Sequence, residues 1–405
     1  MKTGTYSDQW AADDFGMDMF GRLKISNPVT LFDASHRYRA SSDFSDETAS
    51  GGTVTYLANE STSSLNVTTA SGSKVTREST KVFQYQPGKS LQIFQTFVMA
   101  PPQANLRQRV GYFSRNNGIY LEQDGETINL VMRTYTSGSV SEIRVPQENW
   151  DRERLIPNRD RDISLDLKSA QIFFIELEWL GVGSVKCGFV IGGEPIVVHQ
   201  FDHANWIKKV YMQTATLPVR YEIENTAATA SASSLKQICA TVISNGGYDW
   251  ERVANNASRN TEITTNATTY VPIAAIRMAS GRTDSVIIPD DYTVLPTMNG
   301  DYNVVLLKNP TLTGGTWVAS DTGNVEYNVS ATGVSGGTVV HSDYVSSSNQ
   351  MRSQLTFGGG NRLYFQLGRT NAATPTSDVL VLAVKSVAAT TTGGVIGSLS
   401  WFDNT

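Results

Sequence analysis

Two glutamates spaced two residues apart, Glu176 and Glu178, come nearest in this chain to the paired groups that acid–base catalysis needs. On a β-strand such residues share one face, about 6.5–7 Å apart, a workable separation for two carboxylates that cleave a glycosidic bond. The third acid expected further along such a strand is missing, because Leu180 and Gly181 stand there. We interpret the pair as the polar face of a strand, and glycan hydrolysis stays as an alternative.

Residue types that bind metals gather in the short sequence His199-Gln-Phe-Asp202-His203. A zinc site needs a further ligand at a plausible spacing, and none is signalled. Calcium could be held by acids, and the candidates are Asp249, Asp290, Asp291 and Asp301. These acids lack the spacing of a calcium-binding loop. We therefore predict no metal, no cofactor and no catalytic residue.

Cationic and aromatic side chains supply the remaining candidates for binding. A cationic patch could form from Arg107, Arg109, Arg115 and Arg133, although solvated strand faces explain these arginines equally well. Aromatic rings near turns suit sugar binding, because a ring stacks on the sugar while amides hydrogen-bond to it. Most aromatic residues fill cores or subunit contacts instead. As glycan contacts we select Trp150, Trp206, Trp317 and Tyr344.

These candidates must be positioned by strands, as the segment Ser169–Trp206 shows most clearly. It contains three apolar runs that are separated by Gly-Val-Gly and Gly-Gly, and apolar and polar residues alternate within the runs. A period of two indicates half-buried strands, and the glycine turns indicate an antiparallel meander. The segment therefore predicts a scaffold, and the chain is interpreted as a structural or binding protein.

Composition excludes several other classes of protein. The chain has 405 residues, of which 18% are charged, and its net charge is −5. This charge favours neither nucleic acid nor an anionic membrane as a partner. No apolar run approaches the ~20 residues that span a bilayer, and residues 1–10 lack the basic start and apolar core of a signal peptide. We expect a protein that is made and kept in the cytoplasm, without membrane insertion, until something assembles or releases it.

The strand pattern predicts an all-β protein with two sandwiches. Turn residues separate about a dozen short strands in residues 46–250, which indicates a jelly-roll or lectin-like sandwich. Residues 251–262 lose the alternation and are predicted to be a linker, and residues 263–405 are predicted to form a second, smaller β-sandwich.

Residues 1–45 are predicted to be an extended N-terminal docking arm. This segment is apolar but too short to enclose a core of its own, so it must bury its apolar side chains against something else. Another subunit is the favoured partner, and the following domain is the alternative. The docking residues would be Phe20, Leu23, Ile25, Leu31 and Phe32.

Four blocks of this sequence resemble virion structural proteins of tailed bacteriophages, of the kind common in marine phages and cyanophages. The blocks are Phe20–Asp33 (FGRLKISNPVTLFD), Lys81–Gly125, Gln171–Asn205 and Ser285–Val345, which includes LLKNPTLTGG. Members of this group look like components of tails, fibres, baseplates or heads. They supply no catalytic motif to transfer.

The resemblance implies a non-enzymatic component of the phage particle. We expect a tail-associated part (a tail fibre, spike base or baseplate) with a role in host attachment. The alternatives are a capsid decoration or head-fibre protein and a free carbohydrate-binding module. The expected partners are other virion proteins of the tail, neck or capsid, further copies in a homo-oligomer, for which a trimer is favoured, and a host surface glycan.

Overall fold

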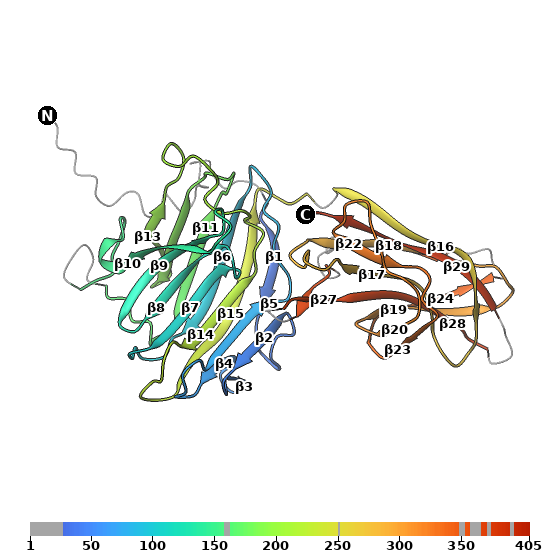
Figure 1. Ribbon diagram of the computed structural model, residues 1–405, viewed down its shortest axis with the longest axis horizontal. Coiled ribbons are helices and arrows are strands. Elements are labelled where there is room, and N and C mark those ends of the chain that lie inside the picture. The colour runs from blue at the N-terminus through green and yellow to red at the C-terminus, as the bar shows by residue number, and fades with distance from the viewer. Residues whose placement is uncertain are drawn as a thin grey trace. The chain divides into compact units, whose positions relative to one another are not determined.

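The computed structural model describes residues 27–157, 163–249, 252–347, 353–356, 366–370, 374–388 and 393–405. The chain divides into two compact units, of which the first runs to Tyr248 and the second begins at Asp249 (Figure 1). Within the described residues, the helical conformation is confined to the three-residue 3-10 helix η1, Gln147–Asn149, and to Ser347. The predicted all-β fold class is confirmed.

The first unit contains an antiparallel eight-stranded sheet. Its order is β13-β12-β11-β6-β15-β4-β3, and β1 also pairs with β15. The strands are β1 Val29–Ala34, β3 Thr53–Leu57, β4 Thr62–Val67, β6 Ser90–Val98, β11 Gln171–Leu177, β12 Val185–Ile191, β13 Glu194–Phe201 and β15 Ser233–Asn245.

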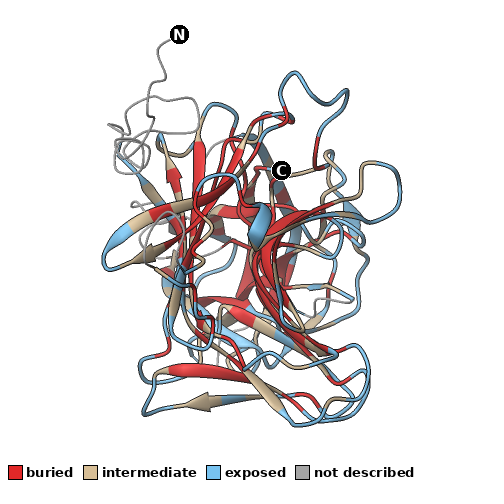
Figure 2. Ribbon diagram, turned by 90° about the vertical axis from the view of Figure 1, so that its left-hand side faces the viewer, coloured by how far each residue is buried: buried red, intermediate tan, exposed pale blue. Residues whose placement is uncertain are grey.

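The first unit also contains an antiparallel seven-stranded sheet, with the order β10-β9-β8-β7-β14-β5-β2. Its strands are β2 Phe44–Ala49, β5 Lys74–Ser79, β7 Leu106–Phe113, β8 Gly118–Asp124, β9 Thr127–Thr134, β10 Ser141–Pro146 and β14 Val219–Asn225. Buried residues follow the strands of this unit, and the connecting loops are largely exposed (Figure 2). Alternating side chains of both sheets thus fill a core, as the period-two pattern requires.

Where the predicted docking arm reaches the described residues, it packs on the following domain, which is the alternative, rather than presenting Leu31 and Phe32 to another subunit. Leu31 and Phe32 lie on β1 and are buried inside the first unit, where the Phe32 ring lies 5.0 Å from that of Phe83 and 5.7 Å from that of Phe44. Two consecutive residues can both face the core because the register with β15 shifts between Thr30 and Phe32. The other three docking residues, Phe20, Leu23 and Ile25, lie outside the described residues.

The second unit is built from two main sheets. The four-stranded sheet has the order β16-β29-β18-β25, and the six-stranded sheet has the order β21-β22-β17-β28-β19-β24. The four-stranded sheet contains β16 Val253–Thr265, β18 Ile287–Pro296, β25 Ser353–Thr356 and β29 Gly393–Asp403. The six-stranded sheet contains β17 Val271–Met278, β19 Asp301–Lys308, β21 Val318–Ala319, β22 Val325–Asn328, β24 Thr338–Ser346 and β28 Val379–Ser386.

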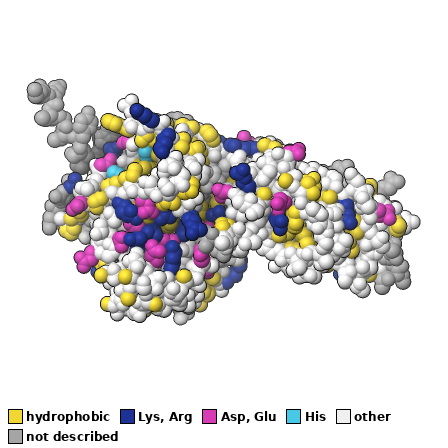
Figure 3. Space-filling view, in the orientation of Figure 1, with side chains coloured by type: hydrophobic (Ala, Val, Ile, Leu, Met, Phe, Trp, Pro, Cys, Tyr) yellow, Lys and Arg dark blue, Asp and Glu magenta, His cyan; other side chains and the backbone are white. Residues whose placement is uncertain are grey.

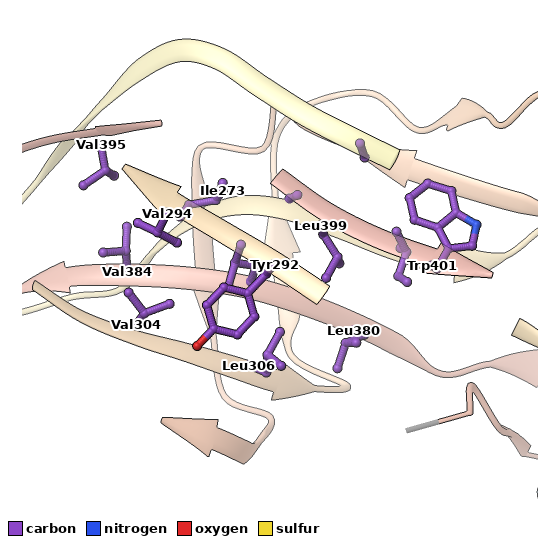
Figure 4. Packing of buried hydrophobic residues seen from close by; sticks show 14 of the residues in the cluster. Ile273, Tyr292, Val294, Val304, Leu306, Leu380, Val384, Val395, Leu399 and Trp401 are labelled. Carbon is purple, nitrogen blue, oxygen red and sulfur yellow. The ribbon is translucent and has the colours of Figure 1, made fainter. Parts of the chain in front are cut away.

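Apolar side chains from both sheets form the core of the second unit. Tyr292 and Leu399 from the four-stranded sheet meet Val304, Leu306 and Val384 from the six-stranded sheet (Figure 4). Two further strand pairs belong to this unit: β20 Thr311–Thr313 with β23 Gly333–Ser335, and β26 Arg369–Thr370 with β27 Thr376–Ser377.

The predicted linker at 251–262 is wrong for the residues that the structure describes, because β16 occupies Val253–Thr265. This strand lies at the edge of its sheet and pairs with β29. Ala257, Ile263 and Thr265 are buried, whereas most of its other side chains are polar and exposed. Backbone hydrogen bonds to β29 hold this edge strand in place. Few of its side chains enter the core, so apolar and polar residues do not alternate in its sequence. No helix among the described residues is long and apolar enough to cross a membrane.

Candidate functional site

A row of polar and aromatic side chains crosses the outer face of the six-stranded sheet. Asn303 on β19 lies opposite Tyr344 on β24 and opposite Lys385 on β28. Tyr270, immediately before β17, completes the row, since the Lys385 ammonium lies 4.9 Å from the centre of its ring. Neighbouring strands lie about 4.7–4.9 Å apart, so the row spans about 14 Å. We call these residues, together with Ser342, the tyrosine row.

Asn303 organises the tyrosine row through three hydrogen bonds. Its Oδ1 accepts from the hydroxyl of Tyr270 at 2.6 Å, and its Nδ2 donates to Ser342 Oγ at 3.0 Å and to the backbone oxygen of Asp343 at 3.1 Å. Asn303 itself is buried. A buried amide with both ends satisfied fixes the groups around it, so Tyr270 and Ser342 are held in place without a ligand.

The outer groups of the row remain open to solvent. Tyr344 is 71% exposed, Ser342 is exposed, and Tyr270 and Lys385 are half-buried. Further along the same face, Leu312 of β20, Val334 of β23 and Trp317 pack over the apolar residues Val305, Leu307 and Ala383. The open part of the face thus offers two rings, a hydroxyl and a cation, which are the groups that bind a sugar by stacking and hydrogen bonding.

The outer face of the seven-stranded sheet in the first unit carries different chemistry. Strands β5, β7, β8, β9, β10 and β14 present six cations and six carboxylates that form ion pairs with one another. We call them the charged layer: Lys74, Arg107, Arg109, Arg133, Arg144, Arg220, Glu78, Glu122, Asp124, Glu142, Glu222 and Glu224. Figure 3 shows these signs of charge mixed together over the strands that Figure 1 labels β7, β8 and β14. Three arginines of the predicted cationic patch, Arg107, Arg109 and Arg133, are therefore each paired with a carboxylate and do not form a positively charged surface.

The centre of the charged layer is buried and fully paired. Arg109 donates from Nε to Glu122 at 2.9 Å and also binds Glu222, while Arg220 Nη2 lies 2.7 Å from Glu222. The side chains of Glu122 and Glu222 are 0% and 2% exposed. The guanidinium of Arg133 lies 5.0 Å from the centre of the Tyr120 ring, so aromatic faces support the same network.

Two carboxylates of this layer have clearly shifted pKa values. Burial alone would raise the pKa of Glu222, but the charges of Arg220, Arg109 and Lys74 outweigh burial and hold that pKa well below its usual range. Burial also opposes the charged form of Glu142, yet a hydrogen bond from Tyr120 and the charge of Arg133 lower its pKa to about 2. A general acid needs a raised pKa, so both shifts run against acid catalysis here.

The glutamate pair that suggested hydrolysis does not form an accessible site. Glu176 lies on β11, is 1% exposed and accepts a hydrogen bond from Ser90 Oγ at 3.1 Å. Glu178 follows the strand and is 0% exposed. A substrate must reach both carboxylates of a hydrolase. The interpretation as an exposed polar face is also wrong, because both side chains are buried.

The predicted metal-ligand candidates point to separate partners. His199 Nδ1 lies 2.8 Å from Asp151 Oδ1, while Asp202 accepts from Ser184 Oγ at 2.7 Å. His203 Nδ1 lies 2.7 Å from the backbone oxygen of Gly183, and burial lowers the pKa of this histidine. Among the described residues, no group of three or more histidine, cysteine or acidic side chains is placed to hold a metal ion.

The four selected aromatic residues have different surroundings. Trp150 is 1% exposed, with its ring stacked on Phe189, so its selection as a glycan contact is wrong in this structure. Trp317 is half-buried beneath the guanidinium of Arg277, 4.1 Å from the ring centre. Trp206 is 78% exposed and, like Tyr344, is accessible to a ligand. The structure places Tyr344 and Trp317 on one face of the second unit.

Trp206 belongs to an exposed apolar patch at two neighbouring loops of the first unit. The patch consists of Leu180, Val182, Trp206, Ile207 and Val210. The backbone nitrogen of Tyr211 donates to the backbone oxygen of Gly181 at 3.0 Å, which ties the two loops together. We call this surface the loop patch. Exposed apolar groups gathered in this way are typical of interaction sites.

Sequence reasoning identified Tyr344 but missed Tyr270, Asn303, Ser342 and Lys385. In the sequence these residues read as polar positions that alternate with the core residues of their strands. Only the pairing of β24, β19 and β28 brings them side by side. A weak signal was present in the asparagine on β19, because a polar amide between apolar neighbours must find partners when it is buried.

Comparison with known proteins finds no matching family model and no matching curated protein. Solved structures do match. One is a Bacteroides ovatus family GH16 protein from a mixed-linkage glucan locus, in complex with an oligosaccharide product. It is 10% identical to this chain, the match covers 52% of this chain and 99% of the other, and the TM-score is 0.36.

Two further matches are binding domains. The CBM2 module of the evolved Dit protein of Lactobacillus casei BL23 phage J-1 has 6% identity, covers 55% of this chain and 98% of its own length, and has a TM-score of 0.36. The Emp47p carbohydrate recognition domain has 11% identity, corresponding coverages of 55% and 99%, and a TM-score of 0.32. Scores this low carry no argument about function, which must come from the residues themselves.

Proposed function

We propose that this protein is a non-catalytic, glycan-binding component of a tailed-phage virion. The observation that carries the proposal is the tyrosine row, in which the buried amide of Asn303 lies between the exposed ring of Tyr344 and the cation of Lys385. An aromatic platform with fixed polar neighbours is the arrangement that holds a sugar ring. Antiparallel strand pairing positions it, so little conformational freedom is lost when a glycan binds.

The non-catalytic part of the proposal follows from the acids of the first unit. Glu122 and Glu222 both form ion pairs with Arg109, and the pKa values of Glu142 and Glu222 are lowered. Glu176 and Glu178 are buried. Glycan cleavage needs one carboxylic acid that stays protonated near neutral pH. We therefore assign binding rather than hydrolysis.

The virion part of the proposal is supported by the sequence resemblance and by the loop patch. Five apolar side chains exposed on tied loops give the first unit a surface that a neighbouring virion protein or a further copy can cover. We favour a tail-associated position in a homo-oligomer, with a trimer as the expected state, and binding of the host surface through the second unit. Assembly would take place in the host cytoplasm.

The glycan function is tested by calorimetric titration of the purified full-length protein with host surface polysaccharide. We expect binding by the natural protein and a loss of about ten-fold or more in affinity for Tyr344→Ala, since a stacked ring contributes on the order of 1 kcal/mol or more. Tyr38→Ala is the matched control, because it removes an 83% exposed tyrosine ring from the first unit, outside the tyrosine row, and should bind normally. Equal binding by Tyr344→Ala would contradict the proposed site.

The virion assignment has its own experiment, which is immunogold labelling of intact particles. Label on tails or baseplates is expected. Label on capsid faces would favour the decoration alternative, and particles without label would contradict a virion role. Release of sugar fragments from the polysaccharide by the purified protein would contradict the non-catalytic assignment.

A further inference from the structure

We infer that the tyrosine row selects anionic sugars, whose carboxylate or phosphate group binds Lys385. This inference rests on the proposed glycan function and adds the chemical class of the ligand. It depends on two features of the row: the balance between donors and acceptors, and the pairing of its cation.

The groups that the row leaves free for a ligand are mainly donors. Asn303 Oδ1 is occupied by the Tyr270 hydroxyl, and Asn303 Nδ2 is occupied by Ser342 Oγ and a backbone oxygen. Because Ser342 Oγ already accepts a hydrogen bond, its own O–H remains to donate. The exposed Tyr344 hydroxyl can donate as well, and Lys385 adds the donors of its ammonium group. The hydroxyl oxygens can also accept, but Lys385 can only donate, so a ligand that supplies acceptors satisfies more of this surface than one that supplies donors.

Lys385 also differs from the cations of the charged layer. Within the part of the chain that the structure describes, no carboxylate lies within ion-pair distance of its ammonium, whose contact is with the Tyr270 ring at 4.9 Å. Its neighbours in the same unit are paired: Lys308 lies 2.9 Å from Asp378, and Arg277 lies 2.8 Å from Glu326. An ammonium group that rests on an aromatic face and has no carboxylate partner can bind an anion.

One acid lies close by along the same strand. Asp301, the first residue of β19, is exposed and shares the outer face with Asn303, because residues two apart on a strand point to one side. Its charge opposes an anionic ligand. Asp301→Asn should therefore strengthen binding, whereas loss of Lys385 should weaken it.

The test uses the full-length protein on a glycan array that holds each anionic glycan beside its neutral counterpart. Oligogalacturonate is paired with its carboxyl-reduced form, and a phosphorylated mannan oligosaccharide is paired with its dephosphorylated form. We expect the protein to prefer the charged member of a pair by about ten-fold, the effect of one charge-assisted hydrogen bond. Which pair shows the preference distinguishes carboxylate from phosphate.

Three variants connect the preference to this site. Lys385→Met should bind charged and neutral members equally, Lys385→Arg should keep most of the preference, and Asp301→Asn should increase it by about two- to three-fold. Tyr344→Ala should lose both members of a pair. Equal binding of charged and neutral glycans by the natural protein, or an unchanged preference in Lys385→Met, would overturn the charge inference while leaving glycan binding intact. Binding to no glycan would overturn both proposals.

Discussion

The outer face of the seven-stranded sheet and the outer face of the six-stranded sheet both carry polar side chains from neighbouring strands, yet these side chains behave differently. In the charged layer, each of the twelve ionised groups has an opposite charge within ion-pair distance, and its centre is buried. In the tyrosine row, one buried amide is satisfied internally, while two rings, a hydroxyl and a cation stay open.

The comparison shows that the density of charge on a face does not by itself identify a binding site. Ionised groups that satisfy one another have little to offer a ligand, which would have to break existing pairs in order to bind. A few groups that are oriented by a fixed neighbour, but whose hydrogen-bonding capacity is not used up, can bind a ligand with a smaller loss of conformational freedom. The predictions below test this contrast.

The largest effect is expected from breaking the charged layer. Glu222→Ala removes the shared partner of Arg109, Arg220 and Lys74. The carboxylates that remain beside them, Glu122, Glu224 and Glu78, leave the buried layer with an excess of positive charge. We expect the free energy of unfolding of the first unit to fall by about 3–5 kcal/mol, as measured by urea denaturation. Lys236→Ala, which breaks an exposed 2.6 Å pair with Glu60, is the matched control and should cost at most about 1 kcal/mol. Equal losses in the two variants would show that the layer is not a buried network.

A smaller loss of stability is expected from Asn303→Ala in the second unit. This change leaves the Tyr270 hydroxyl and Ser342 without their shared partner at a buried position. We expect about 1–3 kcal/mol of destabilisation together with weaker glycan binding. Asn303→Asp keeps the acceptor for Tyr270 and should retain more stability than Asn303→Ala. If both variants bind glycan normally, the amide does not organise the row.

The two units should also differ in their response to acid. The pKa of Glu142 is about 2 in the folded protein, against an ordinary value of 4.5. A lowered folded pKa means that this stabilisation is complete above about pH 4.5 and is lost as the pH falls toward 2. Thermal melts between pH 6 and pH 2 should therefore show the first unit losing stability in this range. Glu142→Gln should make its melting temperature less dependent on pH, and an unchanged pH profile in that variant would contradict the assignment.

The smallest effect on stability is expected from Tyr344→Ala. The side chain is 71% exposed, so its removal should change the free energy of unfolding by no more than about 0.5 kcal/mol while it lowers glycan affinity. Differential scanning calorimetry measures the change in stability on the same protein that is used for the binding titration. A large drop in melting temperature would mean that Tyr344 is a structural residue, and the binding result would then need another explanation.

The sequence by itself determined the all-β class, because alternation of apolar and polar residues with glycine turns is a local signal that antiparallel strands require. It also identified Tyr344 and Trp206, both exposed, as accessible aromatic residues. It failed at Trp150, whose burial depends on a stacking partner, Phe189, that is distant in the chain. It also failed at β16, because an edge strand is defined by backbone pairing with β29 rather than by apolar side chains.

Only the tertiary structure decided which polar residues act together. Arg109 and Glu222 are separated by more than one hundred positions in the chain, and the pairing of β7 with β14 makes them neighbours. The tyrosine row likewise joins positions 270, 303, 344 and 385 through three strand pairings. The physical reason is that the period of a strand fixes which face a side chain takes, whereas its neighbours on that face are fixed by long-range register, which no local pattern encodes.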